Sequence, residues 1–261
     1  MKNQSGQAKT DAKDKKGQLP ALDNTEQARG IRLNKFIAAA GYCSRRQADR
    51  LIEQKQVFLN DKVAELGARV FPQDKVVIDN QIIKAQEEAD LVYLAFNKPQ
   101  GIVCTANPEV EDNIIDFINY PQRIFTIGRL DKDSEGLILL TNDGSIFNKI
   151  VRAEYENEKE YLVEVDHPFD ADFIHAMQSG VKILDTLTNP TKVQPITRKK
   201  FKLTLTQGLN RQIRRMCEAL GYKVVFLQRI RIMNITLGSL PLGTYRELSD
   251  KELRDLFALL P

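Results

Sequence analysis

The sequence predicts an α+β protein with two folded domains, a small basic N-terminal module and a larger mixed domain. A chain of 261 residues with 42% hydrophobic residues is long enough to bury more than one core. Short helical and strand patterns follow one another along the chain after residue 30. A polar stretch at residues 84–90 separates the two regions and is the expected linker.

The N-terminal region divides into a tail and a module. Residues 1–28 hold few large apolar residues, so they cannot bury enough surface to offset their ordering entropy, and we expect a disordered tail. In the module, residues 30–83, an apolar stripe at helical spacing ends at Gly41. Ser44-Arg45-Arg46-Gln47 is a capping box for a second helix. Apolar runs around turns at 60–61 and 79–80 then predict two short hairpins.

The larger domain, residues 91–261, mixes strand and helix patterns. Apolar runs or alternation predict strands over 91–96, 124–127, 137–140, 160–165, 201–205, 224–227 and 230–235. Helical spacing and capping signals predict helices over 112–118, 170–181, 210–220 and 249–260. The last of these helices begins at the capping box Ser249-Asp250-Lys251-Glu252.

Composition excludes several classes of protein. No apolar run approaches the roughly 20 residues that span a bilayer, and the polar N-terminus lacks the apolar core of a signal peptide. Three distant cysteines, Cys43, Cys104 and Cys217, predict reduced thiols and a cytoplasmic protein. The two histidines, His167 and His175, form no ligand cluster, and no nucleotide fingerprint is present. We therefore expect no metal and no cofactor.

The charge is unevenly distributed although the net charge is only +3. Residues 29–62 hold eight Lys and Arg against three Asp and Glu, and residues 198–231 hold ten against one. Residues 63–197 hold twelve against twenty-three. A single charge run is usually a solvated face. Two basic blocks on helical patterns favour a surface for a polyanion, and nucleic acid in particular.

The segment from Gly128 to Leu137, Gly-Arg-Leu-Asp-Lys-Asp-Ser-Glu-Gly-Leu, is a charged loop between two apolar strands. A loop held by two strands can present one side chain rigidly. Asp131 lies near its middle, beside Arg129 and Lys132, which favour the carboxylate form. On local evidence alone, a solvated turn explains the same pattern.

The helix expected at 210–220 carries arginines on one side. Ile213 and the apolar residues spaced with it share one face, while Arg211, Arg214 and Arg215 lie roughly on the other. Arg214 falls nearest the seam between the faces, where a guanidinium could reach into a cleft. The alternative is that all three arginines form a solvated face.

The loop sequence resembles the active-site motif of pseudouridine synthases, in particular the RsuA branch. The resemblance implies that Asp131 is catalytic and that Arg214, in Asn-x-Gln-Ile-Arg-Arg, pairs with it. It also implies that Tyr161, in Lys-x-Tyr, stacks on a flipped target base. Lys-Pro-x-Gly at 98–101 resembles another motif of the family. Further expected substrate-binding residues are Arg129, Arg211, Arg215 and Lys98.

The N-terminal module resembles the S4 domain, a small RNA-binding module. This resemblance implies an α/β RNA-binding fold for residues 30–83, joined to a synthase domain with a mixed, mostly antiparallel sheet flanked by helices. The expected RNA-binding residues of the module are Arg32, Lys35, Arg45, Arg46 and Arg50. Without the resemblance, the sequence shows only a compact basic module, and a protein–protein adaptor is a serious alternative.

The implied reaction isomerises a specific uridine of RNA without a cofactor. Within the RsuA branch, the wording over about residues 30–260 is most similar to the large-subunit synthase F (RluF) group, which implies 23S rRNA as substrate and a tRNA anticodon uridine as the alternative. We expect a monomer with no membrane partner. The chain lacks the long basic C-terminal tail of some members, so affinity for RNA should rest more on the S4-like module.

Two competing hypotheses are a non-catalytic RNA-binding or ribosome-assembly factor, and a hydrolase that uses Asp131 with Asp133.

Overall fold

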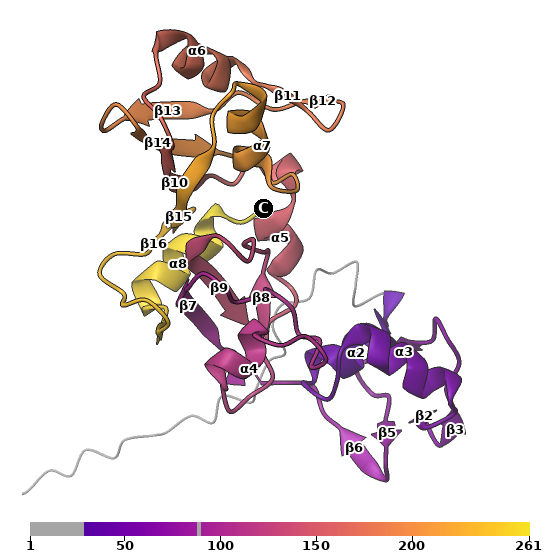
Figure 1. Cartoon of the computed structure of the whole chain (residues 1–261). Coiled ribbons are helices and arrows are strands. Elements are labelled where there is room, and N and C mark those ends of the chain that lie inside the picture. The colour runs from indigo at the N-terminus through magenta and orange to yellow at the C-terminus, as the bar shows by residue number, and fades with distance from the viewer. Residues whose placement is uncertain (1–28, 88–89) are drawn as a thin grey trace, which may run out of the picture. The chain divides into compact units, whose positions relative to one another are not determined.

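The computed structural model describes residues 29–87 and 90–261, and the chain divides into two compact units (Figure 1). The units are Met1–Asp90 and Leu91–Pro261, and each is described by itself. The tail expected at residues 1–28 lies outside the described residues, as do residues 88 and 89 of the expected linker. The rest of that linker, 84–87 and Asp90, contains no strand and no α-helix.

The first unit combines two helices with short antiparallel strands. The helices are α2 (Leu33–Ala39) and α3 (Arg45–Glu53). A four-stranded sheet has the order β3-β2-β5-β6, and a separate pair joins β1 to β4. The strands are β1 (Ile31–Arg32), β2 (Val57–Leu59), β3 (Lys62–Val63), β4 (Arg69–Val70), β5 (Val76–Ile78) and β6 (Gln81–Ile83). Both helices and both hairpins were predicted, whereas the pair of β1 with β4 was not.

Local chemistry explains the ends of these elements. The Ser44 hydroxyl accepts a hydrogen bond from the main-chain N–H of Gln47 and so caps α3. The hairpin turns place Asn60, Asp61, Asp79 and Asn80 at positive φ, which Asn and Asp tolerate better than most residues. One core, which includes Leu33, Ile37, Ile52 and Val57, lies between the helices and the strands.

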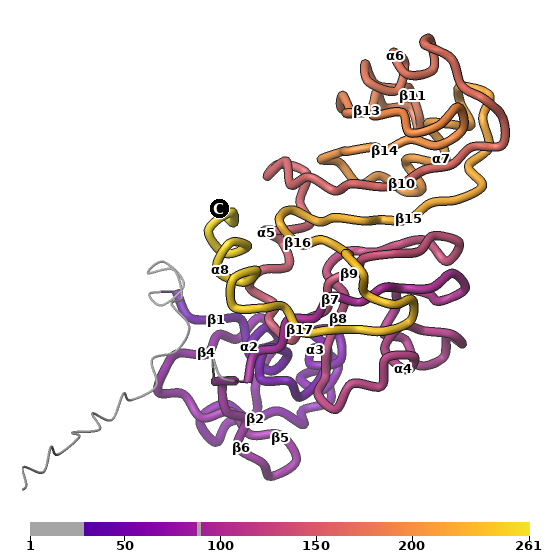
Figure 2. Tube along the Cα trace, turned by 90° about the vertical axis from the view of Figure 1, so that its left-hand side faces the viewer, coloured from indigo at the N-terminus to yellow at the C-terminus, as the bar shows by residue number. Residues whose placement is uncertain are grey.

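The second unit is built on one large sheet. Its path is β13-β14-β10-β15-β9-β7-β17, with β16 paired to β15 and β8 paired to β9 (Figure 2). The central junction of β9 with β15 is parallel, and the other pairs are antiparallel. The strands are β7 (Tyr93–Lys98), β8 (Phe125–Ile127), β9 (Glu135–Thr141), β10 (Lys159–Val165), β13 (Lys192–Pro195), β14 (Lys200–Leu205), β15 (Val224–Ile232), β16 (Ile235–Thr236) and β17 (Tyr245–Glu247).

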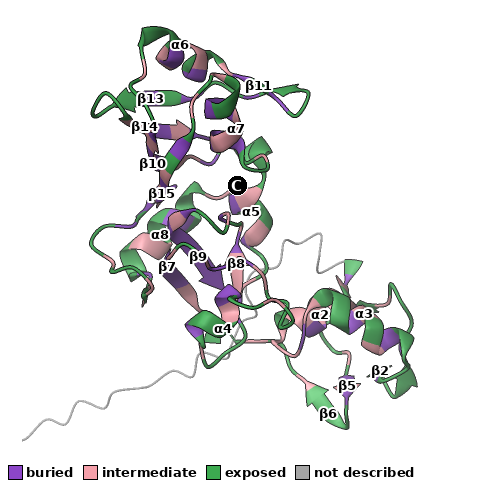
Figure 3. Ribbon diagram, viewed as in Figure 1, coloured by how far each residue is buried: buried purple, intermediate pink, exposed green. Residues whose placement is uncertain are grey.

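Helices cover the sheet and create two cores. One core lies under α4, α6 and α7, and the other lies under α5 and α8. Figure 3 shows the central strands largely buried and the outer helix faces exposed. The helices are α4 (Ile114–Ile118), α5 (Phe147–Val151), α6 (Ala171–Ser179), α7 (Gln212–Ala219) and α8 (Asp250–Leu259), with a 3-10 turn η2 (Ala153–Tyr155) and a small hairpin of β11 (Lys182–Ile183) and β12 (Thr186–Leu187).

Most of the predicted elements are present, with two instructive differences. The two strands expected at 224–227 and 230–235 are one strand, β15, which ends at Ile232, followed by the short β16. The helix expected from residue 210 begins at Gln212, because Arg211 adopts the left-handed conformation with φ of 51°. Within the residues described, no helix is long and apolar enough to cross a membrane.

Candidate active site

The loop that carries Asp131 connects β8 to β9 and closes with a tight turn. The main-chain N–H of Ser134 donates to the carbonyl of Asp131 at 3.1 Å. Gly128 and Gly136, with φ of 75° and 102°, stand at its two ends, where the backbone enters a region that residues with a side chain rarely adopt. Because β8 and β9 pair directly with each other, the two roots of the loop are held together.

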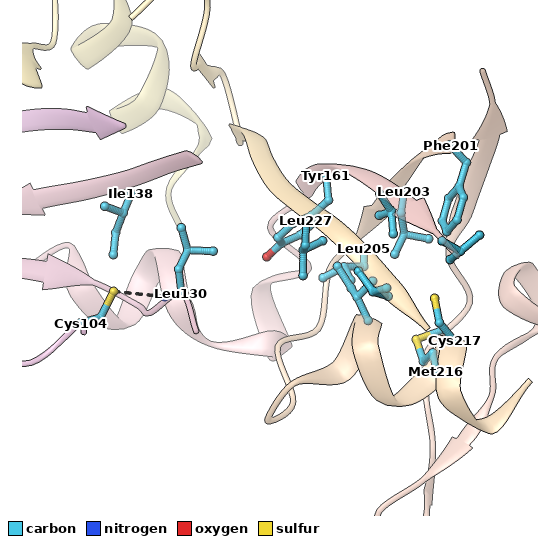
Figure 4. Packing of buried hydrophobic residues seen from close by; sticks show 14 of the residues in the cluster. Cys104, Leu130, Ile138, Tyr161, Phe201, Leu203, Leu205, Met216, Cys217 and Leu227 are labelled. Carbon is cyan, nitrogen blue, oxygen red and sulfur yellow. Dashed lines mark hydrogen bonds between the residues drawn. The ribbon is translucent and has the colours of Figure 1, made fainter. Parts of the chain in front are cut away.

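The main chain of this loop is fastened from several sides. The N–H of Leu130 donates to the Cys104 sulfur at 3.4 Å, as the dashed line in Figure 4 shows. The N–H of Gly101 donates to the carbonyl of Lys132 at 2.8 Å. The Glu135 carboxylate at the end of the loop accepts a hydrogen bond from the Gln228 amide at 3.1 Å. The residues on either side of Asp131 are therefore bonded to other elements of the fold.

Lys98 also bonds the main chain of this loop. Its side chain is fully buried, and the ammonium donates to the carbonyls of Pro99 and Ile102, each at 2.8 Å, and of Lys132 at 3.5 Å. Burial lowers the pKa of this lysine, and the nearby Cys104 and Asp131 act in the opposite direction. The sequence predicted Lys98 as a substrate-binding residue. Its ammonium instead bonds the main chain next to Asp131.

The Asp131 carboxylate itself is half-exposed. Among the residues that the structure describes, no group donates a hydrogen bond to it and no cation lies within ion-pair distance. A carboxylate on a fastened loop, without a partner of its own, can act on a bound molecule. Asp133, two residues later, is exposed and pairs with Arg211 at 3.7 Å instead.

Arg214 reaches the loop from α7. Its guanidinium donates to the carbonyl of Asp133 at 2.8 Å, the hydroxyl of Ser134 at 3.2 Å and the carbonyl of Val224 at 3.3 Å. The direct pair with Asp131 that the sequence predicted does not occur in this structure, and Nη1 and Nη2 bond these three oxygens instead. Burial lowers the pKa of Arg214, and the positive charge of the neighbouring Arg211 lowers it further. Asp131 and Asp133 act in the opposite direction, because they stabilise the charged guanidinium.

The other arginines near the loop differ in their partners. Arg215 donates to the main-chain and side-chain oxygens of Asn210, at 3.0 and 3.2 Å, and so holds the segment before α7. Arg211 and Arg129 are exposed. Of the three arginines assigned to the outer face of the helix, Arg211 is therefore the one whose guanidinium stays at the surface, apart from its ion pair with Asp133.

Tyr161 lies on β10, and only 9% of it is exposed. Figure 4 shows it beside Leu227 of the neighbouring strand β15, with the hydroxyl oxygen directed away from Phe201. Its ring belongs to the core that α7 covers. The tyrosine therefore packs mainly in the core, and a base would contact only the small part of the side chain that stays exposed.

Sequence reasoning missed one residue of this site, Arg229 on β15. It is 4% exposed, its Nε donates to the carbonyl of Leu137 at 2.7 Å, and its Nη1 donates to that of Arg129 at 3.4 Å. Both carbonyls belong to the ends of the Asp131 loop. The available signal was an arginine within the apolar run Val224–Ile232, because arginine is rarely buried in a strand.

The predicted RNA-binding residues of the first unit lie on or beside its helices. Arg45, Arg46 and Arg50 are exposed on α3, Arg32 is exposed immediately before α2, and Lys35 is half-buried on α2. Arg45 and Arg46 begin α3 and Arg50 is in its last turn. The structure thus gathers three arginines on one short helix.

Comparison with known proteins identifies both units. Residues 92–219 match the family model described as RNA pseudouridylate synthase, and residues 31–76 match the S4 domain model. The dual-specificity RNA pseudouridine synthase RluF of Escherichia coli K12 is 55% identical over 230 residues, which cover 88% of this chain and 79% of that protein. This chain belongs to the RNA pseudouridine synthases.

Two further relatives agree with this assignment. The ribosomal large subunit pseudouridine synthase B of Bacillus subtilis is 37% identical over 237 residues, covering 87% of this chain and 96% of that protein. A crystal structure of a pseudouridylate synthase superposes with a TM-score of 0.64 at 33% identity, and the match covers 87% of this chain and all of that one. The chain is thus a pseudouridine synthase with an S4 domain, and the predicted two-part α+β fold is confirmed.

Proposed function

We propose that this synthase acts on a uridine of 23S ribosomal RNA, with Asp131 as its catalytic residue. The observation that carries the assignment of Asp131 is its geometry. Its carboxylate has no partner among the described residues, and Lys98, Arg214 and Arg229 bond the main chain of its loop. The RNA target rests on the similarity to relatives named for ribosomal and dual-specificity RNA modification.

The chemistry fits a single fixed carboxylate. Pseudouridine formation breaks the N1–C1′ bond of uridine and forms a C5–C1′ bond, while the C5 proton is lost and N1 gains a proton. A carboxylate can act as nucleophile at C1′ or as base at C2′, and both routes require it to be held next to the ribose. The fastened loop supplies that position. The target nucleotide must leave its stack to reach it.

The cations divide into two groups in this proposal. Arg214 and Lys98 hold the loop, whereas Arg211, Arg129 and Arg215 line its surroundings and contact RNA phosphates. Tyr161 contacts the target base through the part of its side chain that stays exposed. Residues 30–83 bind RNA through Arg32, Lys35, Arg45, Arg46 and Arg50, and residues 91–261 perform catalysis. We place the enzyme in the cytoplasm as a monomer.

A second substrate is favoured by one observation. The 55% identical relative is named a dual-specificity enzyme. A tRNA uridine is therefore the second candidate target, and the same experiment tests both RNAs.

The test is pseudouridine mapping of total rRNA and tRNA from cells that lack this protein. The cells are complemented with wild type, with Asp131→Asn, or with Asp133→Asn as the matched control from the same loop. We expect one 23S rRNA uridine to lose its modification and to regain it with wild type and Asp133→Asn only. Full restoration by Asp131→Asn would show that Asp131 is not the catalyst and would favour a binding factor. Restoration at a tRNA site alone would replace rRNA as the target.

A further inference from the structure

Arg229 occupies the closest approach of two strands in the second unit. The parallel register of β9 with β15 sets Arg229 opposite Gly136, the glycine at the end of the Asp131 loop. A methyl group built on Gly136 would lie 2.3 Å from the carbonyl oxygen of Arg229 and 2.7 Å from its nitrogen. These distances are far below van der Waals contact, so the backbone of Arg229 is pressed directly against the root of the loop.

The side chain of Arg229 then bridges both arms of the loop. Nε donates to the carbonyl of Leu137, just after the loop, and Nη1 donates to that of Arg129, two residues before Asp131. A guanidinium is a planar fork of fixed geometry, so two such bonds define the separation of the two carbonyls. Across the antiparallel pair, Arg229 also faces Tyr161 of β10, and side chains directly opposite share one face of a sheet.

The charge of Arg229 has no counter-ion among the residues described. Within the described part of the chain, no carboxylate pairs with it, and Nη2 is buried without any hydrogen-bond partner. Burial is the main cause that lowers the pKa of Lys159 on the neighbouring strand to about 8, and the positive charge of Arg229 acts in the same direction. Arg231, two residues away on the same strand, differs in this respect, because it pairs with Glu158 at 2.9 Å and with Glu160 at 3.6 Å.

An unpaired buried charge is unfavourable, and an apolar residue would stabilise such a strand better. The guanidinium is thus poorly explained by stability alone. Its bonds end on the loop that presents Asp131 and its position faces Tyr161.

We propose that Arg229 is a positioning residue, which fixes the two arms of the Asp131 loop and the spacing between Asp131 and Tyr161. The inference rests on the proposed role of Asp131. It adds a second arginine that fastens the loop, at a different part of the loop from Arg214. Arg214 bonds the turn at Asp133 and Ser134, whereas Arg229 bonds the roots.

The decisive variant is Arg229→Lys in the full-length enzyme, with Arg231→Lys as the matched control and Asp131→Asn as the inactive reference. An ammonium keeps the charge, but it cannot hold two carbonyls in the geometry of a fork. A displacement of about 1 Å in an active site can lower turnover about 100-fold. We therefore expect kcat to fall about 100-fold in Arg229→Lys, with KM for RNA and the melting temperature close to wild type. Arg231→Lys should retain kcat within about threefold.

Amide hydrogen exchange provides a second measurement that does not need activity. The amides of residues 129–137 should exchange faster in Arg229→Lys and remain as in wild type in Arg231→Lys. An Arg229→Lys protein with normal kcat and normal exchange in the loop would overturn the proposal, as would a loss confined to KM or shared equally by Arg231→Lys. If instead Asp131→Asn is as active as wild type, the assignment of Asp131 itself has failed, and the role of Arg229 fails with it.

Discussion

At the scale of single residues, three cations around the Asp131 loop act mainly on the main chain. Lys98, Arg214 and Arg229 all donate to carbonyl groups of the Asp131 loop or its immediate flanks. Each such bond satisfies a backbone acceptor and also fixes its position. Among the described residues, none of the three pairs with a carboxylate, and the Asp131 carboxylate interacts electrostatically with Lys98 and Arg214 without being bonded to either. Such a site can fix the position of a carboxylate and still leave it free to react.

Glu252 shows the opposite arrangement, a charge fully matched by its partners. Its carboxylate accepts two hydrogen bonds from the Arg246 guanidinium, at 2.7 and 2.8 Å, and one from the N–H of Ser249 at 2.9 Å. The Ser249 hydroxyl in turn accepts the Glu252 N–H, which completes the predicted capping box of α8. The bonds from Arg246 are the largest cause that lowers the pKa of Glu252 from 4.5 to about 2.

We predict that Glu252→Gln lowers the free energy of unfolding at pH 7 by about 1–3 kcal/mol, the value of hydrogen bonds to a charged group. A carboxyl whose pKa is lower in the folded state stabilises the fold above its unfolded pKa and loses this effect as the pH falls towards the folded value. The difference between wild type and variant should therefore be constant above about pH 5 and shrink between pH 4.5 and 2. Urea denaturation across this range measures it.

Asp255→Asn is the control for this prediction. Asp255 forms an exposed ion pair with Lys251 on the same helix, and such pairs contribute at most about 0.5 kcal/mol. A difference between wild type and Glu252→Gln that stays the same down to pH 2 would contradict the account of Glu252.

At the scale of elements, the junction of β9 with β15 holds the site together. It is the parallel pair in an otherwise antiparallel sheet, and it joins the strand after the Asp131 loop to the strand that carries Arg229. Gly136 permits this approach, because it combines a φ of 102° with no side chain to meet the backbone opposite.

We predict that Gly136→Ala lowers the free energy of unfolding by at least about 3 kcal/mol, since the methyl group would force β15 away and the backbone would also be strained. For a protein of this size that corresponds to a fall in melting temperature of at least about 6 °C. Gly144→Ala is the control, because a methyl group there meets nothing within 4 Å. A Gly136→Ala protein that melts like Gly144→Ala would show that the strands are not in close contact.

Most elements could be predicted because their own residues specify them. The capping side chains of α3 and α8 and the Asn-Asp turns of the first unit are local signals. β15 was divided wrongly, because Gln228 and Arg229 interrupt its apolar pattern and are accommodated only by contacts with β9 and β10. The start of α7 was placed too early, because the left-handed conformation of Arg211 is unusual for a residue with a side chain.

The sequence predicted which residues form the site better than it predicted which atoms those residues contact. A motif identifies Asp131 and Arg214 but not which oxygen the guanidinium bonds, because that depends on the positions of Ser134 and Val224 in the fold. Arg229 lies outside the motifs on which the resemblance rested, and its partners are about 90–100 residues away in the sequence. Such long-range partners leave no periodic signal.

At the scale of the whole molecule, the two basic blocks of the sequence differ in how many of their arginines are bonded within the protein. In the block at 198–231, Arg214, Arg215, Arg229 and Arg231 bond to groups of the protein itself. In the block at 29–62, Arg45, Arg46 and Arg50 are exposed and have no ion pair with a described residue. Cations without internal partners are available to phosphates, so the first unit should supply much of the electrostatic affinity for RNA.

We predict that Arg45→Ala with Arg46→Ala weakens RNA binding and reduces the slope of log Kd against log salt concentration by about 1.4–1.8, since each lost phosphate contact removes about 0.7–0.9. The S4 unit should remain folded, because both side chains are exposed and the Ser44 cap of α3 is retained. Removal of two charges from α8, Lys251→Ala with Arg254→Ala, is the control and should leave the slope unchanged. The measurement is fluorescence anisotropy with a labelled rRNA fragment between 50 and about 300 mM salt. An equal loss of slope in both double variants would mean that net charge alone governs binding, whereas an unchanged slope in the α3 variant would remove these two arginines from the RNA interface.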